Sequence, residues 1–387
     1  MDKLHVVIVG AGMGGLTAAL ALRQAGYGVE VYDRAPVLAP AGAGVSLWSN
    51  GIKVLNRLGL GAAVRAIGGP MQHMSYVSKS GELLTHFSLE PLVRAVGQRP
   101  YPVARTDLQR MLLDAVGAGH VTLGAECIAV EQDASSATAV FAHGHRARAD
   151  LVVGADGTHS IIRSGVLGER VERRYVGYVN FNGLVSQSDD LAPSDTWVTY
   201  VGDHQRASLM PVGGGRFYYF FDVPLARGAA PVAPDVASEL AHHFAGWPAP
   251  VQALIQRLDP GRVTRGEIFD IEPLPKLVSG RVALLGDAAH STAPDLGQGG
   301  CQAMEDAWML AHVLLTNDLG VEDALLRYQA GRLERTADII RRARKRSDVT
   351  HGIEPEKTLE WYAELAQEDG SSIMRALAST ILGGPMQ

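Results

Sequence analysis

The chain has 387 residues, of which 47% are hydrophobic and 20% charged, and its formal net charge is -6 at pH 7. This length suffices for two lobes with separate cores, and the negative balance disfavours nucleic acid or an anionic membrane surface as a partner. The two cysteines, Cys127 and Cys301, exclude a disulfide framework, and no Cys/His spacing indicates a metal site, so we expect a reducing, cytoplasmic setting.

The N-terminal stretch predicts a nucleotide-binding unit. Its elements are, in order, an apolar strand over residues 4–9, glycines at Gly10, Gly12 and Gly15, a helix over residues 16–24 and a strand over residues 29–32. Asp33 ends the second strand. The glycines allow a tight turn, close approach of a pyrophosphate and close helix packing, and the acidic residue can bind a ribose hydroxyl. The pattern indicates dinucleotide binding but does not distinguish FAD from NAD.

Two later stretches add to this pattern. Arg105 precedes a predicted helix over residues 108–116, with Thr106 or Asp107 as its N-cap. Further along, a second apolar strand runs into Asp156. Taken singly, each feature is equally well explained as an ordinary helix cap or turn.

The stretch that organises the chain begins where an apolar strand over residues 282–285 runs into Asp287. A glycine-rich turn follows at residues 297–300, and we predict a helix over residues 302–315. Such a turn brings backbone N–H groups close to a ligand, as a cofactor site requires. An ordinary strand-loop-helix connection with a capping aspartate is the alternative.

Taken together, the runs GAGMGG, GADGTHSIIR and GDAAHSTAPDLGQGG resemble the three fingerprints of the flavoprotein aromatic hydroxylases, the single-component FAD monooxygenases. The resemblance implies an α/β fold: a Rossmann-like FAD-binding domain with an interleaved antiparallel-sheet substrate domain and C-terminal helices. It also implies FAD as cofactor, NADH or NADPH as transient electron donor, and O₂ as co-substrate, with hydroxylation through a flavin C4a-hydroperoxide. Carried over by position, the expected cofactor contacts are Gly10, Gly12, Gly14, Gly15, Asp33, Arg34, Ser46, Arg105, Cys127, Asp156, Asp287, Gly297, Gln298, Gly299, Gly300 and Cys301.

We expect the substrate lobe to interrupt the nucleotide-binding lobe, because a predicted hairpin over residues 74–89 lies between its motifs. The expected domains are an FAD-binding domain of residues 1–73, 101–172 and 271–316, a substrate-binding β-sheet domain of residues 74–100 and 173–270, and a C-terminal helical region of residues 317–387. In that last region we predict helices over residues 324–350 and 354–381 on the outside of the fold. The basic cluster at residues 341–346 is expected to be a solvated helix face.

A hairpin in the second lobe carries the candidate substrate residues. In its predicted register, one face carries Arg206, Ser208, Met210, Tyr218, Phe220 and Asp222. A third strand puts Tyr178, Asn180 and Asn182 on one face. An arginine can bind a planar anionic heterocycle through two parallel hydrogen bonds, and a tyrosine or asparagine can orient it. The polar outer face of an ordinary sheet is the alternative, above all for the asparagines.

A closer resemblance, to the FAD-dependent urate hydroxylases, is carried by RRYVGYVNFNGLV, RASLMPVGGGRFYYFFDVP and PDLGQGGCQAMEDA. It implies that Arg206, Tyr218 and Asp295 surround urate as catalytic residues, with Asn180 as a further substrate contact. Asp295, in the cofactor loop, could assist deprotonation of urate as a base. A carboxylate beside a glycine-rich turn could instead accept hydrogen bonds from loop N–H groups.

The implied reaction is hydroxylation of urate at C5 to 5-hydroxyisourate. One alternative is a hydroxylase of another small aromatic anion, such as salicylate or 6-hydroxynicotinate. An alternative of another class is a flavin-binding protein without turnover. A dehydrogenase is disfavoured, because only one GxGxxG run follows a strand and no separate His or Lys site is apparent. The preference between NADH and NADPH and the oligomeric state are left open.

Overall fold

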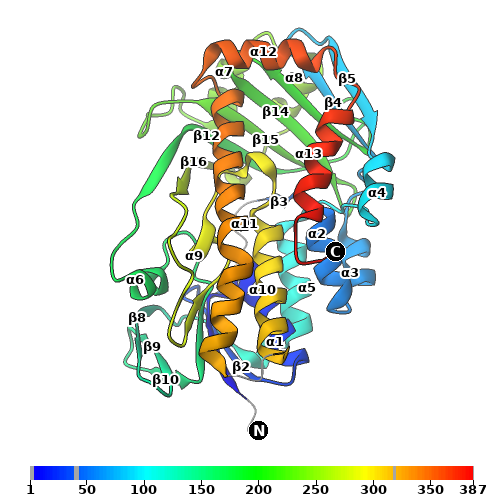
Figure 1. Ribbon diagram of the computed structural model, residues 1–387. Coiled ribbons are helices and arrows are strands. Elements are labelled where there is room, and N and C mark those ends of the chain that lie inside the picture. Colours follow the sequence, from blue (N-terminus) through cyan, green and yellow to red (C-terminus); the bar gives the residue numbers. More distant parts are fainter. Residues whose placement is uncertain (1–3, 39–42, 317–319, 387) are drawn as a thin grey trace.

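Figure 1 shows the computed structural model of the chain, which describes residues 4–38, 43–316 and 320–386. Two large sheets lie at opposite ends of the molecule, and long helices run along them. The predicted α/β fold class, with a Rossmann-like sheet, a second sheet and C-terminal helices, is confirmed. The predicted domain ranges also include residues 1–3, 39–42, 317–319 and 387, which lie outside the described residues.

The nucleotide-binding sheet has six strands in the order β17-β18-β11-β1-β2-β7. Its strands are β1 (His5–Val9), β2 (Gly28–Tyr32), β7 (Val121–Thr122), β11 (Leu151–Gly154), β17 (Val278–Ser279) and β18 (Val282–Leu284). All neighbours are parallel except β17 and β18. Val6, Val7 and Ile8 of the central strand β1 have no exposed surface, as a strand covered by helices on both faces requires.

The second sheet has seven strands in the order β16-β12-β15-β14-β13-β4-β5. Its strands are β4 (His73–Ser78), β5 (Leu83–Ser88), β12 (Arg173–Ser186), β13 (Thr196–Gly202), β14 (Gln205–Val212), β15 (Arg216–Pro224) and β16 (Thr264–Ile271). The hairpin predicted over residues 74–89 is present and belongs to this sheet. The sheet is not wholly antiparallel, because β4 pairs with β13 in parallel.

Two small sheets complete the strands. They are β3 (Gly44–Val45) with β6 (Val103–Ala104), and β8 (Cys127–Gln132), β9 (Ala137–Phe141) and β10 (Arg146–Ala149). The helices are α1 (Met13–Gln24), α2 (Ser49–Arg57), α3 (Gly61–Ile67), α4 (Glu90–Val96), α5 (Arg105–Val116), α6 (Ile161–Leu167), α7 (Val236–His243), α8 (Ala249–Gln256), α9 (Asp287–His290), α10 (Gly299–Thr316), α11 (Val321–Thr350), α12 (Pro355–Leu365) and α13 (Ser371–Leu382). Short 3-10 turns are η1 (Ala118–His120), η2 (Pro260–Arg262) and η3 (Pro294–Leu296).

Strand β15 shows how the seven-stranded sheet divides its two faces. Phe217, Tyr219 and Phe221 are buried in one apolar cluster with residues of α7 and α8. Side chains alternate along a strand, so Tyr218, Phe220 and Asp222 point to the opposite face. The predicted register is confirmed, because Arg206 pairs with Asp222 and Met210 with Tyr218.

Several predicted boundaries were wrong at helix starts. Helices α1 and α10 begin at Met13 and Gly299, three residues earlier than predicted, so glycines of both motifs lie in or beside the first helical turn. Helix α5 begins at Arg105 with Ala104 as its N-cap, so neither predicted capping residue caps it. The carboxylate of Asp107 instead accepts a hydrogen bond from Arg216, 2.5 Å away.

The C-terminal region departs most from its prediction. The helix predicted over residues 354–381 is two helices, α12 and α13, separated at Gly370, whose φ of +89° is unfavourable for other residues. Helix α11 does not lie wholly on the outside, because it packs along α10 and fully buries Tyr328 and Arg332 (Figure 1). The basic cluster is only partly a solvated face, because Arg341 and Lys345 are exposed whereas Arg344 binds the buried Asp270 at 2.9 Å.

Candidate active site

A cavity of about 450 Å³, here the main cavity, joins the start of α1 to the inner face of the seven-stranded sheet. Of the predicted site residues, its lining includes Gly12, Gly14, Ser46, Arg105, Asn180, Arg206, Tyr218, Asp287, Asp295, Gly297, Gly299 and Gly300. The volume lies within the usual range of small-molecule sites. Segments far apart in the sequence therefore meet around one space.

The glycine turn before α1 has the shape that a bound pyrophosphate needs. A Cβ on Gly15 would lie 1.9 Å from the Gly10 carbonyl oxygen, and one on Gly10 would lie 2.2 Å from the carbonyl oxygen of Ala155. These two glycines therefore allow the turn itself. A Cβ on Gly12 would meet nothing within 4 Å, and this residue lines the main cavity. The space beside it would receive the ligand.

The N-termini of α1 and α10 both border this cavity. Neither helix has an acidic residue in its first turn, and α1 has no side-chain cap. Their first backbone N–H groups and positive dipole ends therefore suit a phosphate or another electron-rich group. These features fit FAD.

Arg206 on β14 is the central charge of the wall that the seven-stranded sheet contributes to the main cavity. Its Nε donates to Asp222 Oδ2 at 2.8 Å, and its Nη2 donates to Asp295 Oδ1, also at 2.8 Å. The side chain of Arg206 is 11% exposed. Burial alone would lower the pKa of Arg206, but the two carboxylates outweigh it and raise that pKa, so the guanidinium stays charged.

Asp295 is held by three side chains from separate parts of the chain. Besides the ion pair with Arg206, it accepts a hydrogen bond from the hydroxyl of Tyr178 at 2.9 Å. Nε2 of His351 lies 3.4 Å from Asp295 Oδ1, and the imidazole stacks on the Tyr178 ring with 3.9 Å between centroids. Burial opposes ionisation, but Arg206 and these neighbours lower the pKa of Asp295 to about 2.

The asparagines of β12 form a short relay on the same wall. Asn182 Nδ2 donates to Asn180 Oδ1, and Asn180 Nδ2 donates to Asp222 Oδ1, each at 2.7 Å. Tyr218 lies on the neighbouring strand and also lines the cavity. Burial, followed by the charge of Asp222, raises the pKa of Tyr218, so its hydroxyl keeps its proton at neutral pH. The polar face is therefore turned inward and not toward solvent.

The other predicted cofactor residues lie outside this lining. Asp33 accepts hydrogen bonds from the backbone N–H groups of Ala11 (2.6 Å) and Ala35 (2.8 Å), and Arg34 is exposed beside it. Asp156 accepts bonds from the Ser160 hydroxyl and from backbone N–H groups at the start of α6. Asp156 therefore caps the start of α6, as an ordinary turn aspartate does.

Three further predicted contacts have side chains directed elsewhere. Gln298 accepts a hydrogen bond from Asn50 at 3.0 Å. Cys301 points toward Gly51, where an added Cβ would lie 3.0 Å from its sulfur. Burial raises the pKa of the Cys301 thiol to about 12 and that of Cys127 to about 11, so neither forms a reactive thiolate at neutral pH.

Sequence reasoning missed several groups around Asp295. His351 follows the end of α11, and Arg346 on the same helix lines the main cavity. Trp197 and Tyr76 line it too.

Within the described residues, no group of three or more His, Cys, Asp and Glu side chains is arranged to hold a metal ion. None of the helices in the described ranges has the length and apolar character that crossing a bilayer requires.

The sequence of the chain is similar to a known protein family and to characterised relatives. The family described as FAD binding domain matches residues 3–343. The FAD-dependent urate hydroxylase of Mycolicibacterium vanbaalenii is 50% identical over 386 residues, which cover 99% of this chain and 98% of the relative. The FAD-dependent urate hydroxylase of Klebsiella pneumoniae is 48% identical over 385 residues, which cover 99% of this chain and 100% of that protein.

A crystal structure of Klebsiella pneumoniae HpxO complexed with FAD and uric acid superposes with a TM-score of 0.96 at 47% identity, covering 99% of this chain and 98% of the other. The match spans both sheets and the C-terminal helices. The chain thus belongs to the FAD-binding-domain family of flavoprotein monooxygenases, within the group that contains the FAD-dependent urate hydroxylases.

Proposed function

We propose that the protein hydroxylates urate at C5 to give 5-hydroxyisourate, using FAD, NADH or NADPH, and O₂. The observation that carries the proposal is the Arg206 guanidinium, which is largely buried between two carboxylates and lines the main cavity. Its Nη1 makes no hydrogen bond with any described residue, so a donor is available to an anionic ligand. The similarity to urate hydroxylases over 99% of the chain supports urate as that ligand.

The chain's own residues would position the substrate. Bound FAD, after reduction by the nicotinamide and reaction with O₂, would supply the oxygen atom that is transferred. Arg206 would bind a carbonyl oxygen of urate and stabilise its anionic form, which makes C5 electron-rich. Tyr218 and Asn180 would fix the orientation of the ring. Phe220, over which the Arg206 guanidinium lies at 5.5 Å, would help to exclude water.

Asp295 would act on the protons of urate. With a pKa of about 2 it is a carboxylate at neutral pH, so it can accept a hydrogen bond from a urate N–H. The same low pKa makes it a weak base while Arg206 is paired with it. An anionic urate that binds Arg206 would weaken that pairing and raise the affinity of Asp295 for a proton. We therefore infer that its action as a base, directly or through water, depends on bound urate.

The test uses the FAD-loaded protein with NADH in air, following NADH oxidation and urate absorbance together. We expect urate to stimulate NADH oxidation and to disappear at the matching rate. Parallel reactions with salicylate and 6-hydroxynicotinate are the controls, and neither should be consumed comparably. Stimulated NADH oxidation without loss of urate would contradict the proposal, as would faster consumption of either control compound.

A cytoplasmic location of the protein stays a prediction.

A further inference from the structure

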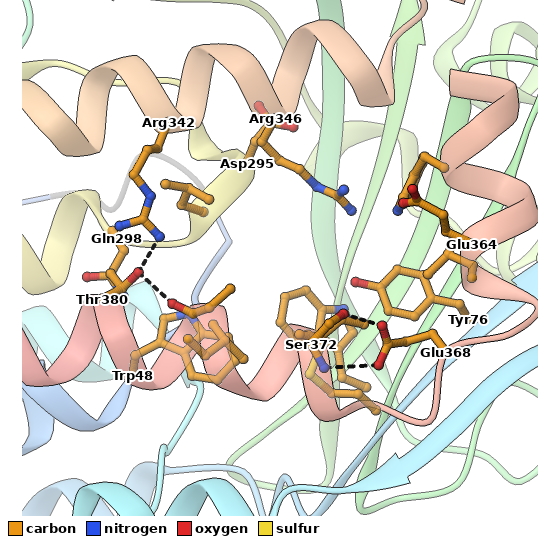
Figure 2. Close-up of a pocket in the computed structure, with 18 residues that line it drawn as sticks. Trp48, Tyr76, Asp295, Gln298, Arg342, Arg346, Glu364, Glu368, Ser372 and Thr380 are labelled. Atoms are coloured by element: carbon orange, nitrogen blue, oxygen red, sulfur yellow. Dashed lines mark hydrogen bonds between the residues drawn. The ribbon is translucent and has the colours of Figure 1, made fainter. Parts of the chain in front are cut away.

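A second cavity of about 310 Å³, here the C-terminal cavity, lies beside Asp295 and is lined by residues of α11, α12, α13 and of strands β4 and β13 of the seven-stranded sheet (Figure 2). Its inner end is formed by Asp295 and Leu296. At its other end are Glu364 and Ser372, which are exposed. The cavity therefore extends from the molecular surface to the carboxylate that pairs with Arg206.

The two cavities share part of their walls. Tyr76, Trp197, Asp295 and Arg346 line both of them. Segments as far apart in sequence as β4, β13, η3 and α11 supply these four residues. These four side chains therefore lie at the junction between the C-terminal cavity and the cavity that Arg206 lines.

Arg346 is the notable charge at this junction. In Figure 2 its guanidinium points into the space between Tyr76 and Asp295. The group lies 4.2 Å from the centroid of the Trp361 ring, and no described carboxylate lies within ion-pair distance of it. By contrast Arg342, one turn away, donates to Thr380 Oγ1 at 2.7 Å and to Asp338 at 3.3 Å. Arg346 is thus a cation directed into the cavity, with no ion-pair partner among the described residues.

The remaining walls suit a flat ring. Trp48 and Trp197 lie 6.1 Å apart between centroids, and Tyr76 and Trp361 face each other edge-on at 6.4 Å. Aromatic faces together with an arginine favour a planar anion, which can stack on the rings and pair with the guanidinium. The C-terminal cavity thus has an arginine beside aromatic rings, as the main cavity has with Arg206, Tyr218 and Phe220.

We propose that the C-terminal cavity is the access route by which a planar anion, the urate of the proposed function, reaches the main cavity, with Arg346 as its binding group on the way. This inference rests on the proposed function for the identity of the anion. Glu364 and Glu368 at the mouth disfavour the doubly charged pyrophosphate of a nicotinamide dinucleotide more than a singly charged purine. The volume also fits one small ring system better than a dinucleotide.

The decisive variant is Ser372→Trp, which places a large ring at the mouth of the cavity. Ser379→Trp is its matched control, because Ser379 is an exposed serine on the same helix and does not line the cavity. Urate binding to the oxidised, FAD-loaded protein without NADH is followed by stopped-flow change in flavin absorbance. This gives the association and dissociation rate constants separately from turnover.

A barrier on a route slows passage in both directions without changing the bound state. We therefore expect Ser372→Trp to lower the association and dissociation rate constants together, by roughly tenfold, with Kd changed by less than about twofold. Ser379→Trp should leave both at wild-type values. Arg346→Gln should lower the association rate constant by about tenfold and weaken its dependence on salt, because it removes the charge that attracts the anion.

Each outcome separates the two proposals. If the wild-type protein neither binds nor consumes urate, the proposed function is wrong, and urate is not the anion of this route. If the wild-type protein binds urate and Ser372→Trp binds it as fast as Ser379→Trp does, the access route is wrong and the proposed function stands. Slower flavin reduction by NADH in Ser372→Trp at saturating urate, with unchanged urate binding, would assign the cavity to the nicotinamide and would also overturn the route.

Discussion

Two arginines in this protein lie buried between pairs of carboxylates, yet their surroundings differ. Arg332 on α11 binds Asp306 through Nε at 2.6 Å and Glu305 through Nη1 at 2.7 Å, and all three side chains are fully buried. Arg206 binds Asp222 and Asp295 in the same way on the wall of the main cavity. By charge and burial alone, the two clusters are nearly equivalent.

The two arginines differ in the guanidinium nitrogens that do not bind a carboxylate. The last nitrogen of Arg332, Nη2, donates to the carbonyl oxygen and to the side chain of Gln302, so each of its nitrogens has a partner inside the protein. Arg206 keeps Nη1 without a partner among the described residues and borders an open volume. A saturated buried arginine holds helices together, whereas one with a spare donor beside a cavity can bind a ligand.

Arg332→Met should have the largest effect and would show that this cluster is structural. The variant removes the buried cation that Glu305 and Asp306 share and leaves them only Arg335 and His290, respectively, which we expect to lower the free energy of unfolding by about 3 kcal/mol. Arg341→Met is the matched control, since Arg341 is on the same helix but exposed, and it should change stability by less than about 0.5 kcal/mol. Urea unfolding of both variants measures the difference. Equal stabilities would contradict the distinction.

Arg206→Gln should reduce catalysis as well as stability, because it also takes the cation from the buried Asp222 and Asp295. Losing a charge-assisted hydrogen bond to an anion costs about 1.5–3 kcal/mol, so kcat/KM for urate should fall by roughly 10- to 100-fold. Arg206→Lys keeps the charge but loses the planar fork, and its loss should be intermediate. FAD content, read from the visible absorbance of the purified protein, should match the wild type. An unchanged kcat/KM in Arg206→Gln would remove Arg206 from the site.

Local patterns were sufficient to predict much of this site. Alternation along β14 and β15 placed Arg206, Tyr218 and Asp222 on one face, because side-chain direction in a strand depends only on position. The glycine turns were recognisable because Gly10 and Gly15 stand where another side chain would meet backbone atoms. In both cases the deciding interactions are close in sequence or fixed by a hairpin register.

The partners of Asp295 could not be predicted in this way. Tyr178 lies 117 positions away in sequence, and His351 reaches the site only because α11 runs the length of the fold. The arginines of that helix look alike in sequence, yet Arg332, Arg344 and Arg346 meet a buried carboxylate pair, a buried aspartate and a cavity respectively. Which surroundings each one finds is decided by how α11 packs, and no local pattern records that.

The smallest expected effect concerns acid stability and tests whether Asp295 is held as a carboxylate by Arg206. The folded pKa of Asp295 is lowered from 3.8 to about 2, by Arg206 and its other neighbours against the opposing effect of burial. A carboxylate with a lowered pKa stabilises the folded protein above its unfolded pKa, and this contribution is lost as the pH falls toward the folded value. Asp295→Asn lacks a group that titrates there.

The stability advantage of the wild type over Asp295→Asn should therefore shrink by about 1 kcal/mol between pH 5 and pH 3, as measured by urea unfolding at both pH values. Other buried carboxylates titrate in both proteins, so their contributions cancel in the difference. If the difference between the two proteins is the same at pH 5 and pH 3, Asp295 is not held as a carboxylate by Arg206, and its assignment as a urate-dependent base loses its physical support.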